Sequence, residues 1–142
     1  FSGSIGRATV FRGMLKPERI RDLAAGDRKD KVAGDSVIKS VFAPQAGHIL
    51  LPAPVEFGSE EITLEAWIKP GKKEDGRIFD MVTPGGMDGF LIDCHPSLVL
   101  RVIVGASLKR FPKAVHPDTW QHVAVVMGKD RLDVYLDGNE LK

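Results

Sequence analysis

Cysteine is almost absent from this chain of 142 residues: Cys94 is the single one, so no disulfide can form within the chain. Cysteine usage therefore does not determine the redox compartment. The longest uninterrupted apolar run is a few residues, whereas a membrane-spanning helix needs roughly 20. We therefore expect no membrane insertion. The net charge is only +1, which gives no general electrostatic reason to expect nucleic acid as a partner.

The sequence also lacks an initiating methionine, and its start shows no signal-peptide pattern of charge, apolar core and small-residue cleavage site. We interpret the chain as a fragment or a processed piece of a larger protein. What is present is typical of a folded domain, with 43% hydrophobic and 27% charged residues, and disorder is not expected. At this length we predict a single core.

Short segments in which apolar and polar residues alternate make up most of the chain, and turn residues separate them. Such segments predict an antiparallel all-β sandwich. Along 62–69 the alternation predicts one apolar face, and an opposite face with Glu65 and Trp67 that we expect to be half solvated. The predicted strands cover 5–12, 37–42, 48–51, 62–69, 78–82, 90–94, 98–104, 108–111, 120–127 and 132–136.

One short helix is predicted near the N-terminus. Pro17 suits its first turn, Ile20 and Leu23 fall on one face, and Gly26 favours its end. The segment 27–36 that follows is almost wholly polar with mixed charge, which is typical of a solvated linker rather than a binding patch.

Five motifs follow one another over about 80 residues. They are Leu64-Glu-Ala-Trp67-Ile-Lys-Pro70, Gly76-Arg-Ile-Phe-Asp80, Gly86-Met-Asp-Gly-Phe-Leu-Ile-Asp93, Trp120-Gln-His-Val-Ala124 and Leu132-Asp-Val-Tyr-Leu-Asp-Gly138. In this order and spacing they resemble the bacterial laminin-G-like, concanavalin A-like modules. The resemblance implies an antiparallel two-sheet jelly roll with one short helix, in the superfamily of lectins and glucanases. It also implies a carbohydrate-binding or adhesion module of a larger exported bacterial protein, secreted, at the cell surface or in the periplasm.

Residues 1–20 resemble the same family, but they are similar to its last strand and closing helix. We therefore divide the chain into a closing strand and helix (1–26), a polar linker (27–36) and the main body of the jelly roll (37–142). The favoured hypothesis is that the N-terminal strand closes the sandwich of its own chain. The alternatives are a fragment that spans two modules and a homo-oligomer in which copies exchange this strand. Closure within the chain requires residues 5–11 to pair with a strand from the main body.

We predict no enzymatic activity. A sandwich glucanase needs acidic residues spaced along one strand as nucleophile and acid, and Glu60, Glu61 and Glu65 do not have that spacing. Cys94 and His95 are adjacent, so in a strand they point to opposite faces and cannot act as a nucleophile and its base.

No cofactor is predicted, and calcium is the one metal that the resemblance leaves open. Asp75, Asp80, Asp88 and Asp93 lie in or beside loops, and carboxylates are the ligands that calcium prefers. The family's closing strand often carries acidic residues where this chain has Gly6 and Arg7, which argues against calcium.

The predicted partner is a glycan or polysaccharide. A sugar-binding site combines an aromatic platform with a few polar anchors, because a pyranose face is apolar and its rim is hydroxylated. We predict Trp67 as the platform, with Asp88, Asp93, His95 and Arg101 as anchors. The alternative is that the tryptophans pack in the interior, which favours a structural or protein-interaction domain.

Overall fold

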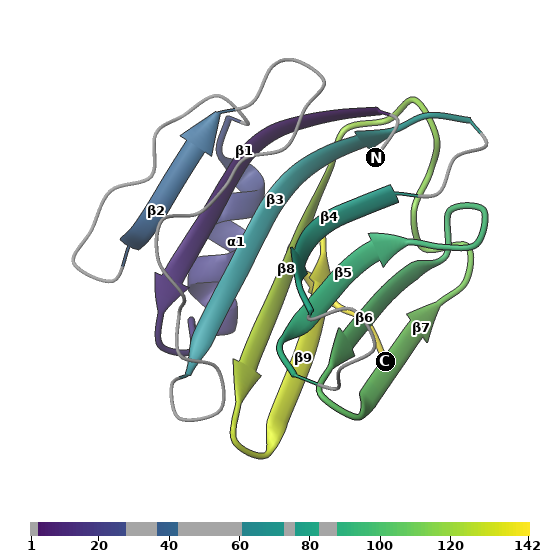
Figure 1. Cartoon of the computed structure of the whole chain (residues 1–142). Helices are drawn as coiled ribbons and strands as arrows, with labels where there is room; N and C mark the ends of the chain where they lie inside the picture. Colours follow the sequence, from purple (N-terminus) through teal and green to yellow (C-terminus); the bar gives the residue numbers. More distant parts are fainter. Residues whose placement is uncertain (1–2, 28–36, 43–60, 73–75, 83–87) are drawn as a thin grey trace.

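Two antiparallel β-sheets lie face to face in this protein, with one helix on the outside (Figure 1). The structure is a computed structural model that describes residues 3–27, 37–42, 61–72, 76–82 and 88–142. Its elements are β1 (Gly3–Arg12), α1 (Pro17–Ala25), β2 (Val37–Phe42), β3 (Ile62–Pro70), β4 (Gly76–Met81), β5 (Phe90–Cys94), β6 (Leu100–Val104), β7 (Ser107–Phe111), β8 (Gln121–Gly128), β9 (Arg131–Leu136) and β10 (Asn139–Glu140).

The larger sheet has six strands in the order β10-β9-β8-β3-β1-β2, and the smaller sheet has four in the order β4-β5-β6-β7. The predicted all-β sandwich with one short helix is thus confirmed. The predicted strand at 48–51 and most of the predicted linker lie outside the described residues.

The main core lies between the two sheets. Ile62, Leu64, Ala66 and Ile68 of β3 face the smaller sheet, as the alternation predicts. They meet buried residues of the other sheet and of the neighbouring strands, among them Ile92, Cys94, Leu100, Val102, Val123 and Val125. Each fully buried Leu, Ile or Val side chain stabilises the fold by roughly 1.5–3 kcal/mol, so this layer holds the two sheets together.

β1 lies between β3 and β2 in the larger sheet. Its register pairs Val10 with Leu64 and Thr9 with Glu65 on one side, and Thr9 with Ser40 on the other. Residues 5–11 therefore pair with strands of the same chain, which is the arrangement that closure within the chain requires.

α1 lies across the outer face of the larger sheet (Figure 1). Ile20 packs with Ala124, Val126 and Tyr135, and Leu23 packs with Phe11. The β9–β10 turn also fits closely, since a Cβ on Gly138 would lie 3.2 Å from the Arg21 Cα.

The expectation that the second face of β3 is half solvated is therefore wrong along most of the strand. Thr63 and Glu65 are completely buried on this face, and Trp67 is half-buried. The physical reason is the helix, because strand alternation reports which residues share a face and not what covers that face. Among the described residues, no helix is long and apolar enough to cross a membrane.

Candidate ligand-binding face

The outer face of the smaller sheet carries a row of charged side chains that crosses all four strands. Ile92 and Cys94 of β5, and Leu100 and Val102 of β6, belong to the core, so the residues between them point outward. Cross-strand pairing aligns Arg77 with Asp93, Asp93 with Arg101, and Arg101 with Arg110. We refer to these four residues as the arginine row: Arg77, Asp93, Arg101 and Arg110.

Hydrogen bonds hold part of the arginine row in place. Arg101 donates from Nε to Asp93 Oδ1 at 2.9 Å and from Nη2 to Oδ2 at 2.5 Å, a bidentate geometry that fixes both side chains. Arg77 forms an ion pair with Asp80 on its own strand. Arg110 is exposed, and within the described part of the chain it has no ion pair with a carboxylate. Three guanidinium groups thus share this face with two carboxylates.

An apolar stripe runs beside the arginine row on the same face. Cross-strand pairing aligns Leu91 with Ile103 and Ile103 with Leu108. Leu91 and Ile103 are half-buried, and Leu108 on the edge strand β7 is 48% exposed. Outward apolar side chains beside fixed polar groups are the combination that a sugar ring requires.

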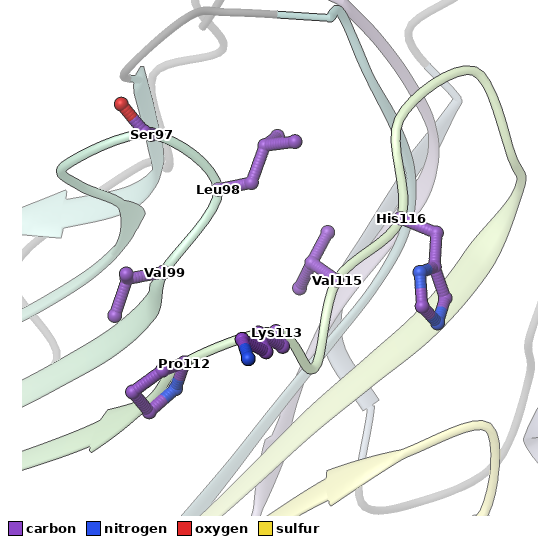
Figure 2. A pocket seen from close by; sticks show the side chains of 7 residues that line it. All are labelled: Ser97, Leu98, Val99, Pro112, Lys113, Val115 and His116. Carbon is purple, nitrogen blue, oxygen red and sulfur yellow. The ribbon is translucent and has the colours of Figure 1, made fainter.

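A pocket of about 360 Å³ lies where the β5–β6 turn meets the loop after β7. Figure 2 shows Leu98 and Val115 pointing into the space between the two loops, while the His116 ring lies on the other side of its loop. Val99 directly precedes β6 and Pro112 directly follows β7, so the pocket lies at the ends of these two strands, near Arg101 and Arg110 in the sequence. The lining residues are Ser97, Leu98, Val99, Pro112, Lys113, Val115 and His116.

Three of these lining residues have the left-handed backbone conformation that favours glycine: φ is +46° at Ser97, +67° at Leu98 and +62° at Lys113. The conformation costs roughly 1–2 kcal/mol for each ordinary residue. Such residues persist where the surrounding structure holds them, and they concentrate at binding sites. Two further residues, Asp118 and Asp137, have this conformation elsewhere in the described chain, so three of the five such residues line the pocket.

The five predicted sugar-binding residues do not come together. Asp93 and Arg101 are hydrogen bonded on the outer face of the smaller sheet, and His95 is exposed in the turn directly after β5. Asp88 precedes the opposite end of β5. Trp67 points away from the core on the larger sheet, so it lies on the opposite side of the sandwich from Asp93. The structure therefore does not bring Trp67 together with Asp93 and Arg101, because the alternation in each strand does not show which faces of two sheets adjoin.

A second polar cluster, which sequence reasoning missed, lies beneath α1. Glu65 is completely buried and accepts hydrogen bonds from Arg7 Nε at 2.8 Å and from His122 Nε2 at 2.8 Å. Arg7 also donates to the carbonyl oxygens of Leu23 at 3.2 Å and of Asp27 at 3.0 Å, at the C-terminal end of α1. The cluster Arg7, Glu65 and His122 therefore ties the helix to β1, β3 and β8.

Electrostatics explains why Glu65 stays ionised inside the protein. Burial by itself raises the pKa of its carboxyl, but the hydrogen bonds from His122 and Arg7 outweigh burial, so the pKa lies below its ordinary value. The Trp67 ring packs edge-on against the His122 ring with centroids 5.5 Å apart. Trp67 Nε1 and His122 Nδ1 are buried and lack hydrogen-bond partners among the described residues. Trp67 thus belongs to this covered cluster.

The structure gives no support to a metal centre in the described ranges, where no three His, Cys, Asp or Glu side chains lie close enough to hold an ion. Asp75, one of the four aspartates weighed for calcium, lies outside those ranges. Glu65 cannot reach a substrate, because α1 and Arg7 enclose it.

The architecture defines the class of protein as a two-sheet antiparallel β-sandwich of the jelly-roll type, with a helix on the outer face of the larger sheet. A family model described as the concanavalin A-like lectin/glucanases superfamily matches residues 44–142. Since the match covers more than half of the chain, the chain belongs to this family. No curated protein and no solved structure matches the chain. The matched range begins after β2, so β1, α1 and β2 lie outside it.

Proposed function

We propose that this chain is a non-catalytic carbohydrate-binding module of a larger exported bacterial protein, and that it binds glycan with the outer face of its smaller sheet. The observation that carries the proposal is the pocket beside the arginine row. Its apolar wall suits the CH face of a sugar ring, and Ser97 and Lys113 are polar residues of its lining. Membership of a superfamily of lectins and glucanases supports the same ligand class.

A binding screen with one pocket variant tests the proposal. Affinity electrophoresis through gels that contain acidic or neutral polysaccharides measures binding without a label. We expect wild-type protein to be retarded by at least one polysaccharide. Leu98→Gly removes a pocket wall, and glycine suits the φ of +67°, so the fold should persist. Losing that apolar contact, worth roughly 1.5–3 kcal/mol, should weaken binding by about 10-fold or more.

The control is Asp118→Gly, which changes another left-handed residue (φ +55°) that does not line the pocket. It should bind like wild type. Retardation of Leu98→Gly equal to that of wild type would exclude the pocket as the binding site. If no polysaccharide retards the wild-type protein, the glycan-binding function itself is wrong.

A structural or protein-interaction domain is the second candidate, because neither Trp67 nor Trp120 is exposed and neither offers an open aromatic platform. Light scattering at several concentrations tests its strand-exchanged form. A constant mass near 15.5 kDa would fit the pairing of β1 within its own chain, whereas a concentration-dependent dimer would favour exchange between copies.

A further inference from the structure

We propose that the glycan bound by this face is acidic, and that Arg110 and Lys113 bind its carboxylate or sulfate group beside the pocket. This inference rests on the proposed function and specifies the class of glycan. Its basis is an excess of positive charge at one place on a chain whose net charge is only +1.

The first step in the argument is the pairing of like charges in the arginine row. Arg110 lies directly opposite Arg101 on the neighbouring strand, and directly opposed like charges destabilise a sheet. The two oxygens of Asp93 face Arg101 in a bidentate hydrogen bond. Arg110 has no such carboxylate among the described residues. An anion beside Arg110 would therefore relieve a repulsion that the strand pairing imposes.

The second step is the position of Lys113. β7 ends at Phe111, so Lys113 follows the arginine row by two residues and lines the pocket. Its side chain is exposed, and it has no carboxylate partner in the ranges that the structure describes. A second cation without a carboxylate partner in the described ranges thus lines the pocket, three residues after Arg110 in the sequence.

The third step is the chemistry that these groups select. A guanidinium group presents two parallel N–H donors that match the oxygens of a carboxylate or a sulfate. The pocket wall of Leu98, Val99 and Pro112 is apolar and suits the ring that carries the acidic group. An acidic sugar satisfies both features, whereas a neutral sugar leaves the cations unpaired.

The test compares matched polysaccharides by affinity electrophoresis of the whole chain. Polygalacturonate supplies carboxylates and dextran sulfate supplies sulfates, while galactan and dextran are their neutral counterparts. The test variant is Arg110→Gln with Lys113→Gln. The control variant is Arg12→Gln with Arg19→Gln, which removes the same charge from exposed residues of β1 and α1.

We expect at least one acidic polymer to bind about 10-fold or more tightly than its neutral counterpart. The test variant should lose at least 10-fold on that polymer, and the control variant less than twofold. The acidic polymer that shows this loss identifies the anionic group as carboxylate or sulfate.

Four results would overturn the inference. Equal binding of neutral and acidic polymers, unchanged in the test variant, would leave the carbohydrate-binding function standing and remove only its acidic specificity. An equal loss in both variants, or equally strong binding of single-stranded DNA, would reveal non-specific attraction of polyanions. Failure of every polysaccharide to bind would reject both the inference and the proposed function.

Discussion

The two outer faces of this sandwich carry the same type of ion pair in different surroundings. On the larger sheet, Arg7 and Glu65 pair beneath α1 and are almost fully buried. On the smaller sheet, Arg101 and Asp93 pair on neighbouring strands, and the arginine remains partly exposed. The chemistry is nearly identical, so the difference in role comes from the helix that covers one face. The covered pair ties the helix to the sheet, whereas Arg101 keeps part of its side chain in contact with solvent although Asp93 is buried.

The ion pairs on the two faces are also expected to contribute differently to the free energy of unfolding. Removing one partner of a buried ion pair typically costs about 3–5 kcal/mol, because the remaining charge is left in a dry interior. An exposed pair such as Arg77 with Asp80 contributes about 0–1 kcal/mol. Substitutions on the covered face should therefore change stability, and substitutions on the open face should change binding.

The largest expected effect follows from Glu65→Leu. It leaves Arg7 buried without its carboxylate, and we expect the free energy of unfolding to fall by about 3–5 kcal/mol in urea denaturation. Adding Arg7→Met should restore much of this loss, since the unpaired charge is then gone. Asp80→Asn on the open face is the control, with an expected change below about 1 kcal/mol. A loss that small for Glu65→Leu would contradict a structural role for the covered cluster.

Trp67→Ala should have the second-largest effect on stability. The ring is half-buried and packs against His122, so we expect a loss of about 2–3 kcal/mol, below the 3–5 kcal/mol of a fully buried tryptophan. Polysaccharide binding by the folded variant should not change. Thermal unfolding and affinity electrophoresis measure the two quantities. A binding defect without destabilisation would return Trp67 to the sugar-binding site.

Lowering the pH should remove the stabilisation that the buried Glu65 carboxylate provides beneath α1. The pKa of Glu65 is lowered in the folded protein from its ordinary value of 4.5, so the unfolded chain binds the proton first as the pH falls. The stabilisation is present above pH 4.5 and is lost as the pH falls through the lower folded value. Unfolding free energies measured between pH 6 and pH 3 should therefore fall more steeply for wild type than for Arg7→Met with Glu65→Leu. Parallel curves would show that this carboxylate does not contribute.

The smallest expected effect is a gain in stability. Lys113→Gly places glycine at φ +62°, and relief of this conformation should exceed the added entropy of the unfolded chain by about 0.5 kcal/mol. The same change removes a cation beside the pocket, so binding to an acidic polysaccharide should weaken as stability rises. Urea denaturation and affinity electrophoresis on one preparation test this opposition. A variant that is less stable would show that no strain is stored at Lys113.

Much of the fold could be predicted because the relevant signals are local. Alternation along 62–69 correctly placed Ile62 and Leu64 in the core, and Pro17 and Gly26 correctly bounded the helix. The candidate site was predictable only in part. Asp93 and Arg101 do lie together on the outer face of the smaller sheet, but Lys113 and Arg110 gave no signal, since isolated cations in a polar segment are typical of any protein surface.

The sequence by itself determined which side chains share a face of each strand, because successive residues in a strand must point to opposite sides. Only the tertiary structure decided which of those faces is open. That outcome depends on α1 (Pro17–Ala25) docking across β8 (Gln121–Gly128) and β9 (Arg131–Leu136), which lie far from the helix in the sequence. The same docking buries Glu65 and half-buries Trp67, whereas Arg77 and Arg110 on the other outer face are exposed to solvent. Docking between segments this far apart is driven by burial of the apolar surface of both elements together. A short segment of sequence shows its own apolar residues but not the surface that will cover them.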